Sequence, residues 1–447
     1  MFLGHFALKG QILLNTSIYC QSASRLARNS GCYFSTSSVP RSKLCSKIMS
    51  TESNRNLAYL TKRLPSLVGR NPKQSVWVEF VEMAMATKAV NLGQGFPDSP
   101  MPSFMAKHMQ DVAACPERTD WHQYTRGYGH MRLVNAISKL YSRLLGVQVN
   151  PQTDILITVG AYLSLYYSFI GWLNPGDEVI IFEPAYDSYV SQIEMAGGVP
   201  VPVVMTLDPK KSDTSAGYTL DFDEVRRKIN SKTKMIVLNN PNNPTGKLYT
   251  RQELETIASI AEEYDLLVLT DEVATGWKVG WSIGPAKILE PLKKVHENCI
   301  FAQNTPIQEA VARAFEQETS LIESGRIEES YLMTGLAKEL LPKRDIIAEY
   351  LKSAGFNPII PDAGYFIIAD FEHLEGPFQP EDETGATLDY RFVRWLCKEK
   401  KLASIPPSAF YSPGNRKEND HFVRLCFFKK DETLNAAIDI LKGFFQK

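Results

Sequence analysis

Four short stretches of this sequence place glycine or polar residues at the end of, or inside, an apolar segment that predicts a buried strand. The tripeptide Gly-Ala-Tyr at 160–162 follows ILITV, and NNPNNPTGK at 239–247 follows KMIVL. Asp271 follows LLVLT, and Arg424 lies within HFVRLCFF. Ligands of open α/β sheets bind beyond the carboxyl ends of the strands. The four stretches therefore predict one shared site.

The first stretch suits a phosphate, and the second holds several side-chain amides in place. Free N–H groups at a helix start, together with the helix dipole, favour a phosphate near Gly160. Asn239 and Asn243 offer both donors and acceptors, and the neighbouring prolines restrict the backbone that carries them. An ordinary tight turn at Gly160 and a plain turn cluster at 239–247 are the alternative interpretations.

The other two stretches place charges where charge is costly. A carboxylate at the end of a buried strand needs a partner, and a cation such as a protonated pyridine nitrogen would keep Asp271 ionised. An N-cap or a salt bridge is the alternative for Asp271. The planar guanidinium of Arg424 suits a carboxylate, either of a substrate or of a protein side chain.

Composition limits the remaining possibilities. The 447 residues are 44% hydrophobic and 22% charged with a net charge of -1, so charge gives no reason to expect binding to nucleic acid or an anionic membrane. The seven cysteines and seven histidines are scattered without a CxxC pair, which argues against a structural zinc site, and no metal is expected. An odd cysteine count without a spacing pattern suits a reducing compartment.

The N-terminal segment, residues 1–51, contains basic, Ser and Thr residues but no Asp or Glu. This composition is typical of a mitochondrial transit peptide, and a disordered tail is the alternative. We therefore predict a mitochondrial protein and exclude the segment from the fold. Met49 could start a cytosolic form.

From about Asp154 onward, apolar strands alternate with amphipathic helices, which predicts a mostly parallel sheet covered by helices on both faces. Residues 155–173 carry no charge and are long enough to span a bilayer, but they are interpreted as a buried strand, a glycine turn and a helix. Thr250 and Glu253 predict a capping box. We expect an N-terminal arm over 52–100 that joins a smaller α+β domain over 331–447, and a large domain over 101–330.

Motifs in a fixed order carry a family resemblance from about Ser75 to the C-terminus. They include VNLGQGFPD, QYTRGYGH, GDEVIIFEPAYDSY, NNPNNPTGK, TDEV, TGWKVGWSIGP, PDAGYFIIAD and FVRLCFFKKDETL. The chain resembles the fold-type-I pyridoxal-phosphate aminotransferases, and within them the kynurenine aminotransferase and cysteine-S-conjugate β-lyase group. The resemblance implies transfer of an amino group from kynurenine and related aromatic or sulfur amino acids to a 2-oxo acid, pyridoxal 5'-phosphate as cofactor, and a homodimer with shared active sites.

The resemblance also implies residue roles. Asp271 would pair with the pyridinium nitrogen, and Asn243 would bond the phenolic oxygen of the cofactor. The other implied cofactor contacts are Gly160, Ala161, Tyr162, Asn239, Lys278 and, from the partner subunit, Tyr124. The implied substrate contacts are Trp77, Gly95, Asn243 and Arg424.

The lysine that forms a Schiff base with the cofactor in this family is absent. The family places it between the TDEV strand and the TGWK loop, whereas Val273 joins Ala274 directly here. Lys278 matches the phosphate contact, and Lys247 is no better placed. The missing block would include an interior strand, and we expect residues 273–276 to close the gap as a hairpin.

Three interpretations of the gap follow. The chain is an active transaminase, a non-catalytic isoform that interferes with dimers, or an incomplete gene model of an active enzyme. We predict that this polypeptide, as written, is inactive or severely impaired.

Overall fold

The computed structural model describes residues 11–16, 75–273, 277–374, 378 and 387–444, all within one unit of the chain. The predicted transit peptide outside residues 11–16, and the centre of the predicted hairpin at 274–276, lie outside the described residues. Among the described helices, none combines the length and the apolar composition needed to cross a membrane.

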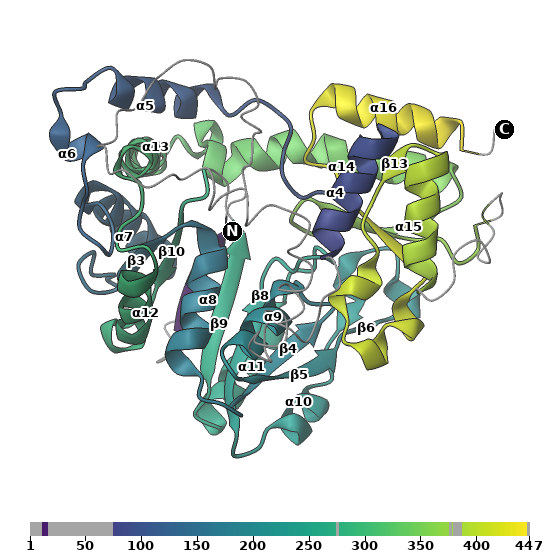
Figure 1. The fold of residues 1–447 in the computed structure, drawn as a ribbon, viewed down its shortest axis with the longest axis horizontal. Helices are drawn as coiled ribbons and strands as arrows, with labels where there is room; N and C mark the ends of the chain where they lie inside the picture. Colours follow the sequence, from purple (N-terminus) through teal and green to yellow (C-terminus); the bar gives the residue numbers. More distant parts are fainter. Residues whose placement is uncertain (1–10, 17–74, 274–276, 375–377, 379–386, 445–447) are drawn as a thin grey trace, which may run out of the picture. The chain divides into compact units, whose positions relative to one another are not determined.

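The main sheet has seven strands in the order β3-β10-β1-β9-β8-β4-β5 (Figure 1). The strands from β1 through β9, β8 and β4 to β5 pair in parallel, and β10 is antiparallel to both of its neighbours. The mostly parallel sheet is therefore confirmed. The bounds are β1 Gln11–Thr16, β3 Ile155–Thr158, β4 Glu178–Glu183, β5 Val199–Val204, β8 Thr233–Asn239, β9 Leu267–Val273 and β10 Gly280–Ile283.

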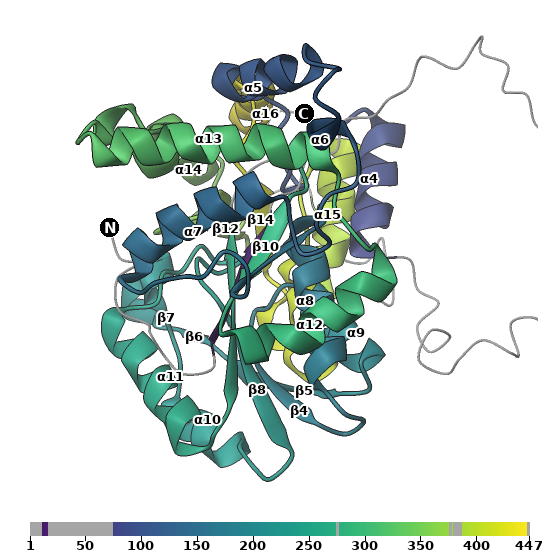
Figure 2. The same cartoon turned by 90° about the vertical axis from the view of Figure 1, so that its left-hand side faces the viewer.

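Helices cover both faces because alternate side chains of the strands are apolar on either side. Val179 and Ile181 of β4 pack with α8, α9 and α12, whereas Ile180 and Phe182 pack with α10 and α11. Figure 2 shows the two helix layers on opposite sides of the sheet. These helices are α8 Gly160–Trp172, α9 Ser188–Met195, α10 Phe222–Lys228, α11 Arg251–Glu263 and α12 Ala286–Cys299.

The uncharged stretch at 155–173 forms the strand β3 and the helix α8, which confirms its interpretation as core. The predicted capping box is also present, with Thr250 Oγ1 accepting from the Glu253 amide and the Glu253 carboxylate accepting from the Thr250 amide. The other helices near this sheet are α5 Ser103–Ala113, α6 Thr119–His122, α7 Met131–Leu145 and α13 Thr305–Glu323.

A second apolar cluster joins the segment that begins near Ser75 to the C-terminal part of the chain. Val76, Phe80 and Leu92 pack with the core residues of the C-terminal helices and strands. The three-stranded antiparallel sheet β11-β12-β14 and the parallel pair β13-β2 lie here. The bounds are α4 Val76–Thr87, β2 Val90–Asn91, α14 Leu336–Ser353, β11 Asn357–Ile359, β12 Phe366–Asp370, α15 Leu388–Glu399, β13 Leu402–Ala403, β14 Phe422–Cys426 and α16 Asp431–Lys442, and a short antiparallel pair elsewhere joins β6 Thr206–Leu207 to β7 Tyr218–Thr219.

The expectation for the gap after Val273 is wrong. The strands β9 and β10 are not neighbours and form no hairpin, because β1 lies between them and pairs with both. The strand β1 occupies the position where an interior strand was expected to be missing. The exclusion of residues 11–16 from the fold is also wrong. The physical reason is that a strand buried within a sheet needs hydrogen-bond partners along both of its edges.

Candidate active site

A cavity of about 260 Å³ lies at the carboxyl ends of strands of the main sheet, beside the β11-β12-β14 sheet. It brings together every predicted site residue except Tyr124. The predicted residues that line it are Trp77, Gly95, Gly160, Ala161, Tyr162, Asn239, Asn243, Asp271, Lys278 and Arg424, and Gln94, Phe96, Tyr186, Tyr365 and Phe366 complete the wall.

The turn after β3 leaves helix-start amides available to a ligand. Gly160 has φ +72°, a backbone conformation that favours glycine, and α8 begins at this residue. Val159 at the N-cap makes no side-chain capping bond, while Thr158 Oγ1 donates to the Gly160 carbonyl at 2.9 Å. The capping amides can therefore bind an anion such as a phosphate.

Asp271 is a buried carboxylate with a hydrogen bond to only one of its two oxygens. It is 4% exposed, and its Oδ2 accepts a hydrogen bond from the Tyr189 hydroxyl. Its Oδ1 has no hydrogen-bond partner among the described residues. Burial raises the pKa of Asp271 to about 6, against the lowering effect of the Tyr189 bond. A cationic ring nitrogen in the cavity would satisfy the free oxygen, so this residue fits the implied cofactor.

The asparagine loop is held to β9 by Asn239. The Asn239 side-chain amide donates to the Asp271 carbonyl at 3.0 Å, and its oxygen accepts from the Asn243 amide at 2.6 Å. Asn243 Oδ1 then accepts from Arg424 Nη1 at 2.9 Å. Asn239 thus holds the loop in place, and Asn243 faces both the cavity and Arg424.

Arg424 is fully buried, and all of its hydrogen bonds go to neutral groups. Nη2 donates to the Gly93 carbonyl at 2.9 Å, and Nε has no partner among the described residues. Burial lowers the pKa of Arg424 to about 10, which still leaves it charged at neutral pH. Its guanidinium carbon lies 4.0 Å from the Phe366 ring centroid and 5.2 Å from that of Trp77. A buried cation without a carboxylate suits an anionic ligand.

The glycine at position 95 is required by the close approach of Phe366. A Cβ built on Gly95 would lie 2.7 Å from Cζ of Phe366. The Trp77 indole on the same wall donates to Asp187 Oδ2 at 2.9 Å, which fixes its ring. Burial raises the pKa of Asp187, and the indole hydrogen bond opposes that rise.

The two lysines considered as substitutes occupy different environments. The Lys247 side chain is 2% exposed and its Nζ forms an ion pair with Glu253 Oε1 at 3.0 Å, so it is not available to a ligand. Lys278 lines the cavity and has φ +58° in the segment that enters β10. Of the lysines that the structure describes, Lys278 alone lines this cavity.

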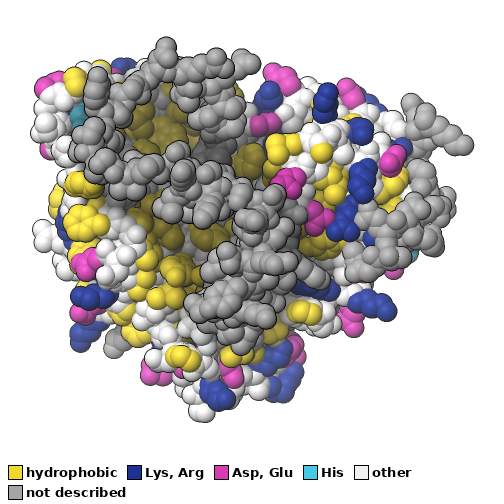
Figure 3. Space-filling view, viewed as in Figure 1, with side chains coloured by type: hydrophobic (Ala, Val, Ile, Leu, Met, Phe, Trp, Pro, Cys, Tyr) yellow, Lys and Arg dark blue, Asp and Glu magenta, His cyan; other side chains and the backbone are white. Residues whose placement is uncertain are grey.

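Tyr124 does not line the cavity of its own chain. Its side chain is 86% exposed and packs edge-to-face against Phe301, with ring centroids 6.4 Å apart. Hydrophobic side chains gather on the left of the face in Figure 3, over the region of α5, α8 and α13. The exposed large hydrophobic residues include Met101, Tyr124, Met131, Tyr162 and Phe301.

Sequence reasoning missed the tyrosines that support the site. Tyr186 lines the cavity, and Tyr189 donates to Asp271 from 82 residues away in the chain. Tyr186 lies two residues before α9 and Tyr189 is the second residue of that helix, and their ring centroids are 5.7 Å apart. The spacing in the motif YDSY was the available signal.

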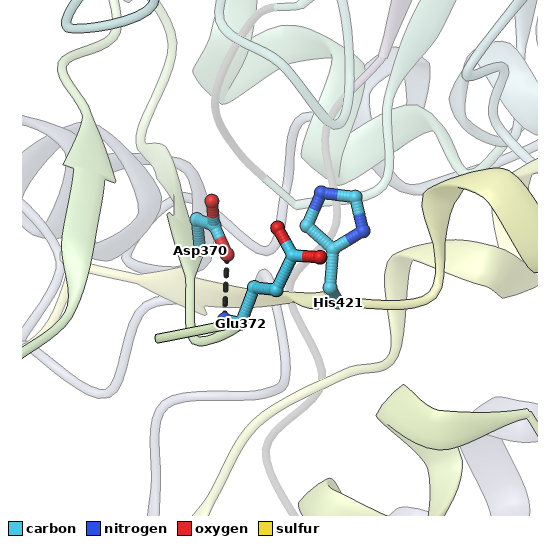
Figure 4. Close-up of side chains that lie close together, drawn as sticks. All are labelled: Asp370, Glu372 and His421. Carbon is cyan, nitrogen blue, oxygen red and sulfur yellow. Dashed lines mark hydrogen bonds between the residues drawn. The ribbon is translucent and has the colours of Figure 1, made fainter. Parts of the chain in front are cut away.

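A separate group, Asp370, Glu372 and His421, brings three potential metal-ligand atoms within 4.8 Å of one another (Figure 4). Asp370 Oδ1 accepts from the Glu372 backbone amide at 2.7 Å. The Glu372 side chain is exposed and the other two are partly buried. Nothing else among the described residues points to a ligand there, so this group supports no site.

Comparison with known proteins places this geometry in a family. The sequence profile described as Aminotransferase class I and II matches residues 87–273 and 273–441, in two parts that meet at Val273. Kynurenine--oxoglutarate transaminase 3 of Bos taurus is 38% identical over 436 residues (89% of this chain and 94% of that protein), and the Homo sapiens protein of the same name is 39% identical over 435 residues (88% and 94%).

Solved structures agree with the sequence comparison. Bna3p, a putative kynurenine aminotransferase from Saccharomyces cerevisiae, superposes with a TM-score of 0.76 at 27% identity, covering 85% of this chain and 98% of that one. N-Succinyldiaminopimelate aminotransferase from Mycobacterium tuberculosis has a TM-score of 0.71 at 30% identity, covering 82% and 96%. The chain therefore belongs to the aminotransferase class I and II family, whose cofactor is pyridoxal phosphate.

Proposed function

We propose that this cavity takes kynurenine and related aromatic or sulfur amino acids as donors, with a 2-oxo acid as acceptor, in pyridoxal-phosphate-dependent transamination. The names of the similar proteins support this substrate class, and so does the wall of the cavity. Trp77, Tyr186, Tyr365 and Phe366 offer aromatic surface to an aromatic side chain beside the charge of Arg424.

Different residues of the cavity would bind different groups of the cofactor and the substrate. The helix start at Gly160 and the ammonium of Lys278 would hold the phosphate, and Asp271 would hold the protonated ring nitrogen. The guanidinium of Arg424 would donate to the α-carboxylate of the amino acid, and Asn243 would orient it. The cofactor, when bound, supplies an electron sink for the bond that breaks at the α-carbon.

Proton transfer at the α-carbon is the step for which this chain is poorly equipped. General acid–base catalysis by a positioned side chain contributes about 10²–10⁴-fold in rate. Lys247 is held in its ion pair with Glu253, and Lys278 stands where the family has a phosphate contact. We therefore propose that this polypeptide binds the cofactor noncovalently and that its transamination is lost or severely reduced. The observation that carries this proposal is the assembled cavity without a second lysine among the described residues.

The test uses the full chain with added pyridoxal phosphate. Turnover of kynurenine with 2-oxoglutarate is expected to equal that of free cofactor. After borohydride reduction, peptide mass spectrometry is expected to show only scattered weak labelling of lysines. Substrate-protected stoichiometric labelling of Lys278, absent in Lys278→Arg, would show a rebuilt active site and refute the proposed loss. Lys247→Arg is the matched control, since its site lies outside the cavity.

A second candidate is a non-catalytic subunit that pairs with an intact family member. Two observations favour it: β1 completes the sheet at the gap, and the exposed aromatic pair Tyr124 and Phe301 remains for a partner. Co-expression of differently tagged chains should then yield mixed dimers with reduced activity. Recovery of unmixed, fully active enzyme would exclude this role.

The incomplete gene model is tested separately. The family match breaks at Val273, where the sequence analysis places the gap, which supports a lost in-frame block. Transcript reads that continue from Val273 into additional coding sequence would favour this explanation, and reads joining Val273 to Ala274 would favour a true isoform.

A β-lyase activity on cysteine S-conjugates would use the same cavity and would appear as pyruvate release. The proposed mitochondrial location is tested by imaging the full chain.

A further inference from the structure

We propose that Gln11–Thr16 is a substitute strand, so that this polypeptide completes its central sheet only while it keeps its N-terminal segment. The strand β1 pairs in parallel with β9 through six residue pairs, from Gln11↔Val268 to Thr16↔Val273. On its other edge it pairs antiparallel with β10, where Leu14 lies opposite Ser282. The inference rests on this strand order and not on the chemistry of the cavity.

The position between β9 and β10 needs an occupant. Val268, Leu269 and Asp271 of β9 are buried, so unpaired backbone groups along that edge would be costly. A direct β9–β10 pair would require β10 to move by about one strand spacing, roughly 5 Å.

Packing on the far side of β10 opposes that movement. All four residues of β10 are paired with β3, from Gly280↔Thr158 to Ile283↔Ile155. The Trp281 ring contacts those of Phe315 and Tyr141, with centroids 5.3 and 6.2 Å apart. Moving β10 alone to close the gap would break these contacts, whereas inserting a strand preserves them.

The sequence of β1 suits an interior position. Ile12, Leu13 and Leu14 form a continuous apolar run, as parallel strands covered on both faces require. In this strand order the end of β9 and the start of β10 are about two strand spacings apart, or roughly 10 Å. Six intervening residues can span roughly 20 Å when extended, so the connection is long enough.

Removal of the N-terminal segment would affect the central sheet. Residues 1–51 have the composition of a transit peptide, and their removal would also remove β1. A start at Met49 has the same effect. The uncleaved chain and the shortened chain are therefore expected to differ in the stability of the central sheet.

A disulfide cross-link tests the pairing in the full chain. The double variant Leu14→Cys/Ser282→Cys places two thiols on directly opposed residues, and mild oxidation is expected to join them within one chain. Leu13→Cys/Ser282→Cys is the matched control, because neighbouring strand residues point to opposite faces and it should cross-link far less. Peptide mass spectrometry separates this bond from those of the native cysteines. No bond, or an equal yield in the control, would overturn the proposal, and a bond only between chains would show strand exchange between copies instead.

Truncation provides the second measurement. In residues 49–447, backbone amides of 268–273 are expected to exchange with deuterium at least about tenfold faster than in the full chain. A synthetic peptide of residues 9–18 should restore protection, and the same peptide with Leu13→Pro should not, because proline lacks the N–H and fits interior strands poorly. Unchanged protection in residues 49–447 would mean that β9 and β10 close directly and would refute the proposal. If the shortened chain is insoluble, Leu13→Pro and Ser38→Pro in the full chain replace it: only the first should speed exchange, and equal exchange in both would refute the proposal.

Discussion

Replacing Asp271 by Asn should make the cofactor-free protein more stable. The same change should weaken the binding of the cofactor. The pKa of Asp271 rises from its ordinary value of 3.8 to about 6 because the carboxylate is buried, and its Oδ1 lacks a partner among the described residues. A carboxyl whose folded pKa exceeds its unfolded pKa binds protons more tightly in the folded state. Its contribution to the stability of the folded state is therefore highest below pH 3.8 and falls as the pH rises toward 6.

The size of this effect follows from the two pKa values. At 1.36 kcal/mol per pH unit, the difference between 3.8 and about 6 corresponds to about 3 kcal/mol of unfolding free energy at neutral pH. Asn has nearly the same shape as Asp, carries no charge and can still accept from the Tyr189 hydroxyl. Asp271→Asn should therefore raise the unfolding free energy at pH 7 by up to about 3 kcal/mol.

The assay is urea unfolding of both proteins from pH 4 to pH 8, with and without pyridoxal phosphate. The difference in unfolding free energy between variant and wild type should grow between pH 4 and 6 and then level off. With cofactor, the wild type should gain more stability than the variant, because a ring cation pairs with the ionised Asp271. Asp389→Asn is the control: burial also raises the pKa of Asp389 to about 6, but Asp389 lies outside the cavity and should leave the gain from cofactor unchanged. Parallel pH profiles of wild type and Asp271→Asn, or a less stable variant at pH 7, would refute the reasoning.

Three further substitutions test the ion pair of Lys247 and the cavity. Lys247→Met should lower the unfolding free energy by about 3 kcal/mol, because it leaves the carboxylate of Glu253 without its buried partner. Urea unfolding measures this change, and an unchanged unfolding free energy would contradict a stabilising role of the ion pair. Arg424→Lys should weaken binding of a kynurenine-like carboxylate by roughly 10–100-fold, since the planar fork of donors is lost. Calorimetric titration in the presence of cofactor measures this affinity, and an unchanged affinity would show that Arg424 does not bind the substrate carboxylate. Gly95→Ala should displace the Phe366 ring from above the guanidinium and lower affinity for aromatic amino acids without changing cofactor affinity, and a matching loss of cofactor affinity would contradict that division.

Much of the site was readable from local sequence because its parts are local structures. The turn at Gly160 needs a positive φ directly before a helix, and the run at 239–247 follows a strand without a break. The capping box at Thr250 and Glu253 depends on two residues of one turn. Convergence of these parts then follows from parallel strands, whose carboxyl ends share one edge of the sheet.

The expectation that the family's lysine segment is missing likewise came from the sequence alone, since Val273 and Ala274 are adjacent. What fills the gap was not readable in this way. A six-residue segment with three central apolar residues carries no local signal of its partners, because strand pairing depends on which edges elsewhere in the fold remain free. The insertion of β1 between β9 and β10 was therefore decided only by the tertiary structure.

The state of each charged group was also decided by tertiary contacts. Sequence placed Lys247 beside the asparagine loop, but its ion pair with Glu253 depends on where α11 lies. Asp271 receives its hydrogen bond from Tyr189, and Arg424 receives its aromatic surroundings from Trp77 of α4 and Phe366 of β12. Burial and distant partners set the energy of a charge, and neither is contained in the residues on either side of it.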